Sequence, residues 1–430
     1  MKICVYGLWH LGSVTAACLA DLGFEVCGLD PDKANVEALS KGKAPLFEPG
    51  LDELITKGLA SGKLSFSDDA YSALSGADFM WVAFDTPVDD KDRADVAYVS
   101  SNVVRVAKHL KSGACVIISS QAPVGTVRSL ELECSRQYPG KELYFACSPE
   151  NLRLGKAIEV FSRPDRIVIG VRDERDIDRF KPVFGKISDR LEWMRTESAE
   201  MTKHAINSFL AMSVVFANEL AGVCEAVGAD ALEVARGLKT EERIGKKAYV
   251  GPGTAFAGGT LARDINFVIQ AGARLSKNTM LFHAINDSND LHKSWVKNKL
   301  KEVLPGLKGK TAAVLGLTYK PGTSTLRRSL AVELCKWLSS EGCTVLAYDP
   351  YAEVLPSSLT VVRVPAVEEV FAKADFVVLG TEHKDFRDMP PQAFSALAGK
   401  PFVDPSGFLR KTADALPEIK YFSVGRGQKI

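Results

Sequence analysis

Short apolar runs alternate with amphipathic helical stretches along the first 170 residues. The run KICVYG (2–7) precedes SVTAACLADLG (13–23), which has helical spacing and a stop at Gly23, and EVCGLD (25–30) follows. Further apolar runs occupy 77–84, 114–120, 143–148 and 166–170, with helical patterns between them. Apolar strands that alternate with helices are typical of a parallel sheet covered on both faces. The pattern predicts an α/β fold with a doubly wound parallel sheet.

The period changes near residue 196. Residues 196–238 contain no proline and keep helical spacing, so we predict one long helix. Its apolar stripe suggests burial against a partner and comprises Ile206, Leu210, Val214, Ala217 and Ala221. A glycine-rich loop (251–259) and further helix to about residue 303 follow.

Strand patterns restart near residue 310. The run EGCTVLAYDP ends a strand in Asp349, as Asp30 ends the second strand, and ADFVVLGTEH (374–383) echoes ADFMWVAFDT (77–86). We therefore predict two Rossmann-like parallel-sheet domains joined by a long central helix and helical domain. The expected domains are residues 1–195, 196–303 and 304–430.

Composition narrows the possible partners. Lys and Arg number 54 and Asp and Glu number 53, a formal charge of +1, which gives no electrostatic footprint for nucleic acid or an acidic membrane. Because no apolar run approaches the roughly 18 residues of a spanning helix, and the start shows no basic n-region or cleavage site, we expect a cytoplasmic protein. The nine cysteines show no C-x-x-C or metal-ligand spacing, so we expect structural thiols and no metal.

The first strand and helix flank a candidate dinucleotide motif. In the segment from Gly7 to Gly12 the first glycine makes the turn and the last lets the helix pack on the strand, and Asp30 lies where a carboxylate binds the ribose 2′-hydroxyl of NAD. Trp9 occupies the middle position, where glycine normally lets the backbone approach the pyrophosphate. We predict NAD binding by Gly7, Trp9, His10, Leu11, Gly12 and Asp30. A Rossmann fold with an altered or lost cofactor site is the alternative.

Several segments resemble, in chain order, the UDP-glucose/GDP-mannose dehydrogenase superfamily. Residues 84–87 with 94–96 look like its "TP…DGSADL" segment, and SSQAPVGT (119–126) is similar to "KSTVPVGT". Three longer segments are also similar to family patterns: SPENLRLGKAIEVFSRPDRIVIG (148–170), SAEMTKHAINSFLAMSVVFANE (198–219) and GLTYKPGTSTLRRS (316–329). The matches extend along essentially the whole chain.

The resemblance implies NAD in the N-terminal domain, a nucleotide sugar (a UDP-sugar) bound largely by the C-terminal domain, and a homodimer formed through the central helix. Typical members oxidise a sugar CH₂OH to a carboxylate through a cysteine-bound intermediate. Lys203 and Asn207, spaced i,i+4, match the groups that polarise the reacting oxygen, which is electrostatic catalysis. Glu150 matches the glutamate that handles water or proton transfer, and Asp264 matches the active-site aspartate. Thr86 and Arg327 match cofactor positions, and the substrate positions are Arg243, Phe256, Gly258 and Lys320.

The sequence departs from the family at the reacting centre. In PGTAFAGGTLARD (252–264), Thr260 falls on the nucleophilic cysteine of "PGFGFGGSCFPKD" and Arg263 on the neighbouring lysine. A threonine hydroxyl needs a dedicated base where a thiol does not. The other departures are Leu154 for a glutamate, Gln121 for a threonine, Ser324 and Thr325 for two aspartates, Arg328 for a glutamate, and Ser406 for an arginine.

We therefore expect an NAD-dependent oxidoreductase that oxidises a nucleotide-linked sugar alcohol by hydride transfer without a cysteine-bound intermediate. Lys203 and Asn207 would stabilise the alkoxide, and Asp264 or Glu150 would act as the base. Two alternatives remain open at this point: a redox-inactive homologue that binds a nucleotide sugar or NAD, and an epimerase that uses transient oxidation.

Overall fold

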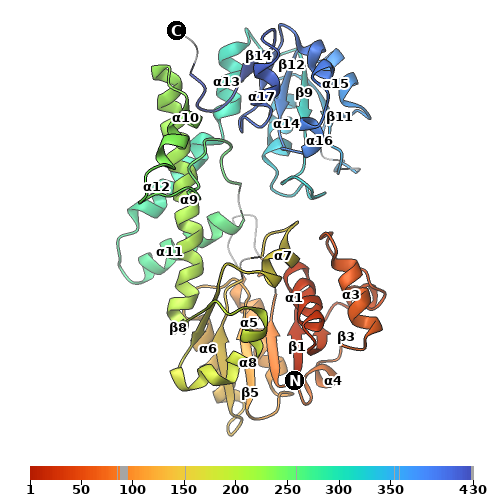
Figure 1. Ribbon diagram of the computed structural model, residues 1–430, viewed down its shortest axis with the longest axis vertical. Helices are drawn as coiled ribbons and strands as arrows, with labels where there is room; N and C mark the ends of the chain where they lie inside the picture. The colour runs from red at the N-terminus through yellow and green to blue at the C-terminus, as the bar shows by residue number, and fades with distance from the viewer. Residues whose placement is uncertain are drawn as a thin grey trace. The chain divides into compact units, whose positions relative to one another are not determined.

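The computed structural model describes residues 1–84, 86–87, 95–150, 152–257, 259–352, 354–357 and 359–427. By its internal contacts the chain divides into a first unit, Met1–Ile206, and a second unit, Asn207–Ile430. Each unit contains one mainly parallel sheet, and a long helix contains the boundary (Figure 1). The predicted fold class is confirmed.

The first unit is built on an eight-stranded sheet in the order β3-β2-β1-β4-β5-β6-β7-β8. All its neighbours are parallel except β6 and β7. Because β7 is antiparallel to β6, it starts at the edge where β6 ends, so residues 148–166 stay at the carboxyl edge of the parallel strands. The strands are β1 (Lys2–Tyr6), β2 (Glu25–Leu29), β3 (Leu64–Ser67), β4 (Phe79–Val82), β5 (Ala114–Ile118), β6 (Leu143–Cys147), β7 (Ile167–Val171) and β8 (Leu191–Arg195).

Helices cover both faces of this sheet. Alternate residues of β1 enter different cores, since Ile3 and Val5 pack with α1, α3 and α8, whereas Cys4 and Tyr6 pack with α4, α5 and α6. The helices are α1 (His10–Asp21), α2 (Lys33–Ser40), α3 (Leu51–Ala60), α4 (Ala70–Leu74), α5 (Val96–Ala107), α6 (Thr126–Gln137), α7 (Ala157–Ser162) and α8 (Ile177–Ile187), with a 3₁₀ turn η1 (Glu174–Asp176).

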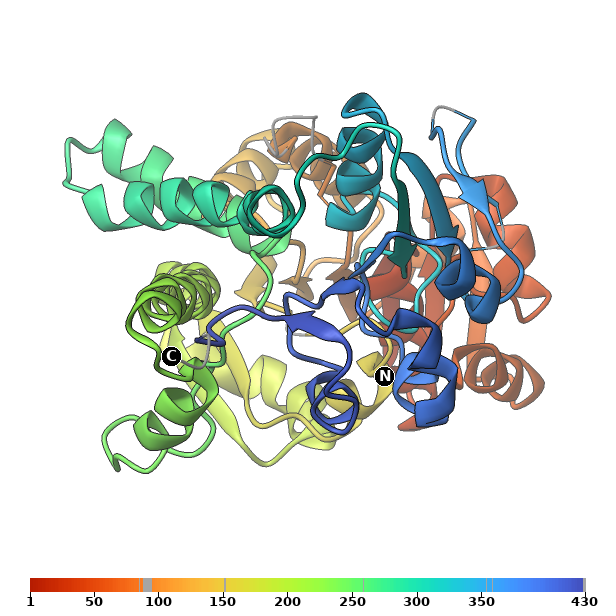
Figure 2. The same ribbon diagram turned by 90° about the horizontal axis from the view of Figure 1, so that it is seen from above.

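The long helix α9 (Thr196–Val227) has 32 residues and is seen nearly end-on in Figure 2. The prediction of one helix to residue 238 was wrong, because Gly228 adopts a φ of +76° and Asp230 starts a new helix, α10 (Ala231–Leu238), by accepting the N–H of Leu232 at 2.9 Å. Of the predicted apolar stripe, Ala217 and Ala221 are buried and the other three residues are half-buried.

The expectation that no stretch approaches the length of a spanning helix was wrong, because by length and composition α9 is the one helix among the described residues that could cross a membrane. Its most apolar 18-residue window is 39% buried inside the protein. Glu200, Asn207 and Asn218 along it make hydrogen bonds to other segments. Polar side chains of α9 therefore bind other segments of the chain.

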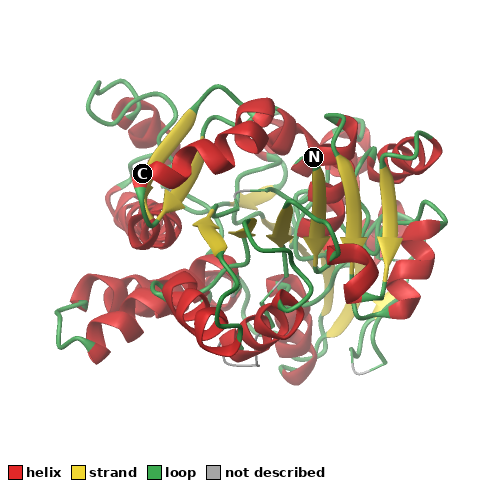
Figure 3. Ribbon diagram, turned by 90° about the horizontal axis from the view of Figure 1, so that it is seen from below, coloured by secondary structure: helices red, strands yellow, loops and turns green. Residues whose placement is uncertain are grey.

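The second unit contains a six-stranded, fully parallel sheet in the order β11-β10-β9-β12-β13-β14. Figure 3 colours the helices, strands and loops of the chain. Its strands are β9 (Thr311–Leu315), β10 (Thr344–Tyr348), β11 (Val362–Arg363), β12 (Phe376–Leu379), β13 (Pro401–Val403) and β14 (Lys420–Phe422). Its remaining helices are α11 (Thr260–Arg274), α12 (Met280–His292), α13 (Trp295–Val303), α14 (Leu330–Ser340), α15 (Val367–Lys373), α16 (Lys384–Arg387) and α17 (Arg410–Asp414), with a 3₁₀ helix η2 (Pro391–Leu397).

The two sheets repeat one design. Both follow the 3-2-1-4-5-6 order of a Rossmann fold, the first with two extra strands. In each, an aspartate after the second strand accepts the N–H of the residue that follows the first-loop glycine: Asp30 accepts Leu8 and Asp349 accepts Leu317, both at 2.6 Å. The similarity expected from the two strand-ending aspartates therefore extends to the hydrogen bonds they make.

Residues 423–427 join the helices of the second unit to its sheet. Ala231 donates its N–H to the carbonyl of Gly425 at 2.9 Å, and Gly425 donates to Glu225 Oε1 at 2.9 Å. A Cβ on Gly425 would lie 2.3 Å from that of Ala231, so only glycine fits. The α9–α10 corner and the sheet thus belong to one structure.

Candidate active site

The loop after β1 has the geometry of a dinucleotide site. Gly7 has a φ of +91°, and a Cβ on Gly12 would lie 1.7 Å from the Gly7 carbonyl oxygen, so both positions require glycine. Asp30, 9% exposed, accepts the N–H of Leu8, and its carboxylate lies at the end of β2. Because that carboxylate would repel a 2′-phosphate, these residues fit NAD. Trp9 precedes α1 with a 49% exposed side chain.

His10 connects this loop to the segment that contains Glu150. Its Nε2 lies 2.9 Å from Oε2 of Glu48, a carboxylate only 4% exposed. Glu48 also accepts the N–H groups of Gly155 at 2.7 Å and Ala157 at 2.8 Å. Leu11 is buried in the core below the loop. Glu48 was not among the site residues predicted from the sequence, and its position before Pro49-Gly50 was the available signal.

Two side chains of α9 hold the SSQAPVGT segment (119–126). Glu200, 6% exposed, accepts the N–H groups of Gly125 at 2.6 Å and Val127 at 2.9 Å, and burial raises its pKa. His204 Nε2 lies 3.1 Å from the carbonyl oxygen of Ala122. The buried Thr86 donates its hydroxyl to the Gln121 carbonyl at 2.6 Å. The predicted cofactor residue Thr86 is therefore fixed against this segment.

Lys203 lies on the same helix and reaches the neighbouring strand end. Its Nζ donates to the backbone carbonyl oxygen of Glu150 at 2.5 Å. The structure thus brings together two of the predicted catalytic residues of the first unit. The half-buried Leu154, which falls where the resemblance places a glutamate, lies on the same segment.

In the second unit, the predicted catalytic residues Asn207 and Asp264 are bonded to each other. The Asn207 amide donates to an Asp264 carboxylate oxygen, joining α9 to α11. Asp264 is fully buried and Asn207 is 7% exposed. Because a buried carboxylate is costly without donors, this bond fixes both side chains. Lys203 and Asn207 are one helical turn apart, on either side of the boundary between the units.

Three side chains that were not predicted from the sequence hold the loop before α11. Asn218 accepts the N–H of Gly253 at 2.9 Å, and His292 Nε2 lies 2.8 Å from the Gly253 carbonyl oxygen. Asn289 makes two bonds with the backbone of Phe256, accepting its N–H at 2.9 Å and donating to its carbonyl at 2.8 Å. The i,i+3 spacing of Asn289 and His292 was the available signal. Phe256 packs in a small core with Ala211 and Ile265.

Thr260 opens α11 with an exposed side chain, and Arg263, one turn later, is half-buried. Gly258, a predicted substrate residue, lies outside the described residues, as does Asp85 of the 84–87 motif. Every cysteine is described, and none is exposed: Cys27 is half-buried and the other eight are buried. Burial raises the pKa of Cys18 and Cys335 to about 12, and of Cys115 and Cys134 to about 11.

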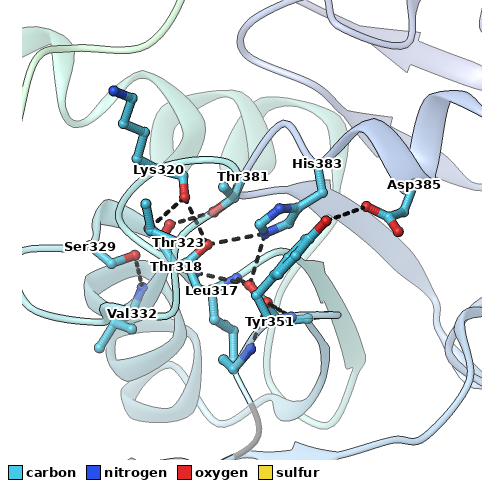
Figure 4. A network of polar contacts seen from close by, with 12 residues as sticks. Leu317, Thr318, Lys320, Thr323, Ser329, Val332, Tyr351, Thr381, His383 and Asp385 are labelled. Atoms are coloured by element: carbon cyan, nitrogen blue, oxygen red, sulfur yellow. Dashed lines mark hydrogen bonds and ion pairs between the residues drawn. The ribbon is translucent and has the colours of Figure 1, made fainter. Parts of the chain in front are cut away.

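The loop after β9 (residues 316–329) is held by a buried polar network (Figure 4). Asp349 accepts the N–H groups of Leu317 and Thr318, and His383 Nε2 lies 3.1 Å from Asp349 Oδ2 and 3.0 Å from Thr318 Oγ1. Burial alone would raise the pKa of Asp349, but the hydrogen bonds, chiefly from His383 and Leu317, lower it to about 2.

Three predicted ligand-binding cations are on the surface of the second unit. The Lys320 side chain points away from the network in Figure 4 and is exposed, as is Arg327. Arg243 has an 88% exposed side chain and pairs with Glu241 at 2.7 Å. Ser406, which falls where the resemblance places an arginine, donates to Asp404 at 3.0 Å.

Comparison with known proteins gives matches along the chain. Residues 1–188 match the model of the UDP-glucose/GDP-mannose dehydrogenase family NAD binding domain, residues 197–291 its central domain and residues 313–411 its UDP binding domain. A UDP-glucose 6-dehydrogenase of Rhizobium meliloti (strain 1021) is 35% identical, with 99% of this chain and 100% of the relative covered. The UDP-glucose 6-dehydrogenase YwqF of Bacillus subtilis (strain 168) is 31% identical over 99% of this chain and 98% of its own. The solved structure of a UDP-glucose dehydrogenase from Pyrobaculum islandicum superposes with a TM-score of 0.89 at 30% identity, covering 99% of this chain and 98% of that one.

Proposed function

The chain belongs to the UDP-glucose/GDP-mannose dehydrogenase family, and on that basis we propose that it oxidises the sugar of a UDP-sugar without a cysteine-bound intermediate. As a member, it is an NAD-dependent oxidoreductase that acts on a CH–OH group of a nucleotide sugar. Bound NAD would accept the hydride. The proposed domains are residues 1–195 for NAD, 196–303 for dimerisation and the active-site loop, and 304–430 for the nucleotide sugar.

The buried Asn207–Asp264 pair is the observation that carries the proposal. Both residues stand at positions that the resemblance assigns to the reaction, and the bond holds the buried Asp264 carboxylate against the Asn207 amide. Thr260, in contrast, falls where the resemblance places the nucleophilic cysteine. None of the nine cysteines is exposed, and Cys224, on the same helix as Lys203, lies about 30 Å from it along the helix at 1.5 Å per residue.

Each retained residue has a proposed role. Lys203 and Asn207, one turn apart on α9, would stabilise the alkoxide that forms as the hydride leaves. Asp264 or Glu150 would take the hydroxyl proton. The loop at Gly7–Gly12, with Asp30 and Thr86, would hold NAD. Lys320 and Arg327 would bind phosphates, and Phe256 and Arg243 would contact the sugar.

A second copy of this chain is the proposed partner of α9. Phe209, Phe216, Val223 and Val227 are 63%, 50%, 58% and 64% exposed, respectively. Their spacing of seven, seven and four residues places them on one stripe of the helix. Exposed apolar stripes of this kind mark surfaces that another protein covers. This stripe supports a homodimer formed through the central helix.

The NADH formed per sugar consumed tests the proposal. The protein is incubated with NAD and a panel of UDP-, GDP- and dTDP-sugars, and NADH absorbance and product masses are recorded. We expect NADH with a UDP-sugar and no sugar adduct on any peptide of the quenched enzyme. Epimerised product without net NADH, or tight binding of NAD and sugar without turnover, would replace this function with an epimerase or a binding protein. A thioester on any peptide would refute the cysteine-free route.

A further inference from the structure

The loop 316–329 has a net positive charge, whereas the family pattern that it resembles has a net negative charge. Its charged residues are Lys320, Arg327 and Arg328, with no carboxylate. The family pattern "GLAFKPNTDDLRES" has two cations and three carboxylates. Ser324 and Thr325 stand where two of those carboxylates occur, and Arg328 replaces the third with the opposite charge. The loop has thus become suited to an anion.

Arg328 lies against the reacting centre. A Cβ built on Gly259 would be 3.1 Å from Nη1 of Arg328, so the guanidinium contacts the residue that precedes Thr260. Thr260 is the position that matches the family nucleophile. A guanidinium therefore sits next to the position where other members attack the sugar C6.

The backbone of Arg328 is held in an uncommon conformation. Its φ of +61° is in the left-handed region, which among the described non-glycine residues only Ser276 shares. The loop around it is fixed: Tyr319 donates its N–H to Thr325 at 2.8 Å, and Ser329 caps α14 by accepting the Val332 N–H at 3.3 Å. The Asp349–His383 network fixes the start of the loop (Figure 4). The backbone from which the Arg328 side chain extends is consequently fixed.

We propose that Arg328 binds a carboxylate on the sugar, so that the substrate is a nucleotide-linked sugar acid. This inference rests on the proposed function, which leaves the sugar open. The planar donors of arginine match the two oxygens of a carboxylate. Lys320 and Arg327 match family positions that bind phosphates. The positive charge of Arg328, in contrast, is absent from the family pattern.

The proposed substrate accounts for the missing thiol. A carboxylate carbon has no hydrogen to give, so oxidation must occur at a ring CH–OH. The hydride of that carbon passes to NAD, its hydroxyl proton passes to the base, and a ketone forms while the carboxylate is unchanged. One NADH and one proton are produced per sugar. No aldehyde is formed, so no nucleophile is needed to retain one.

Matched sugar pairs test the inference with the full-length protein. UDP-glucose is compared with UDP-glucuronate, and UDP-galactose with UDP-galacturonate, because the members of each pair differ only at C6. Initial NADH rates give kcat/KM for the wild type, for R328Q and R328K, and for K336Q as a control that removes an exposed charge from α14. Gln and Lys face the same backbone strain as Arg at this position, so side-chain chemistry is the variable.

We expect the wild type to prefer the uronates. R328Q should lower kcat/KM for uronates by roughly 10- to 100-fold, the range of a charge-assisted hydrogen bond, and change the neutral sugars by less than about threefold. R328K should recover part of the uronate activity, and K336Q should match the wild type. Oxidation of the neutral sugars alone, or an equal loss on both members of each pair, would overturn the inference while leaving the proposed function intact.

Absence of NADH with every sugar would instead overturn the proposed function. Calorimetric titration with the same pairs in the presence of NAD then decides the inference separately. A preference for uronates that R328Q abolishes would support the carboxylate site. Equal binding of both members of each pair, or a preference unchanged in R328Q, would refute it.

Discussion

Replacing Glu48 with glutamine tests how the segment that contains Glu150 is fixed. The Glu48 carboxylate, 4% exposed, accepts two backbone N–H groups and lies 2.9 Å from His10 Nε2. Glutamine keeps the shape but offers one acceptor oxygen, and its amide N–H group would face a backbone N–H. A hydrogen bond to a charged group contributes about 1.5–3 kcal/mol, so the loss of one such bond plus a mismatched donor should cost about 3 kcal/mol.

Hydrogen–deuterium exchange of the peptide 152–162 measures this cost, because local opening controls exchange of the two amides that donate to Glu48. Exchange of these amides should accelerate by roughly 100-fold in E48Q, since 1.4 kcal/mol corresponds to about tenfold. E53Q changes an exposed carboxylate on α3 and should leave the peptide unaffected. Equal protection in E48Q and E53Q would refute the reasoning, as would faster exchange spread evenly over the first unit.

Three further predictions concern the second unit and the partner copy. F216E places a charge on the exposed stripe of α9 and should halve the mass of the particle measured by sedimentation velocity, whereas L132E, at another exposed apolar residue on α6, should leave it unchanged. T260C alone should not form carboxylate from UDP-glucose. T260C combined with R328E, which restores both the cysteine and the glutamate of the family pattern, should form it with two NADH per sugar. Asp349, whose pKa is about 2 against an ordinary 3.8, adds stability that is present above pH 4 and is lost as pH falls towards 2. The free energy of unfolding, measured by urea titration, should fall between pH 6 and 2.5 by about 2 kcal/mol more in the wild type than in D349N.

Much of the fold followed from apolar runs, because strands buried on both faces of a parallel sheet lack alternation. The strands β1, β2, β5 and β6 lie where these runs occur. The strand β8 is only partly buried and was missed. The break of the long helix was also missed, because the helical pattern continues past Gly228 while the break depends on its positive φ.

Only part of the candidate site could be predicted from the sequence. Lys203 and Asn207 share a helix face, so their spacing suggested proximity. In contrast, Glu48 contacts a segment 107 residues away along the chain, and Asn207 contacts a residue 57 positions away. No local pattern encodes such pairs, since they depend on how distant elements pack. The resemblance supplied Asp264, but the clamps by Glu200 and Asn289 required the structure.

The attachment of residues 423–427 to the α9–α10 corner has a consequence for biosynthesis. The first unit is complete once residue 206 has left the ribosome, and N-terminal units generally fold first during synthesis. The second unit must wait until Gly425 emerges before it can seat beside Ala231. For roughly half the translation time, a nascent chain with a finished first unit would therefore expose the apolar side of α9 that packs into the cores of the second unit. We expect chaperones to bind the chain mainly during this interval.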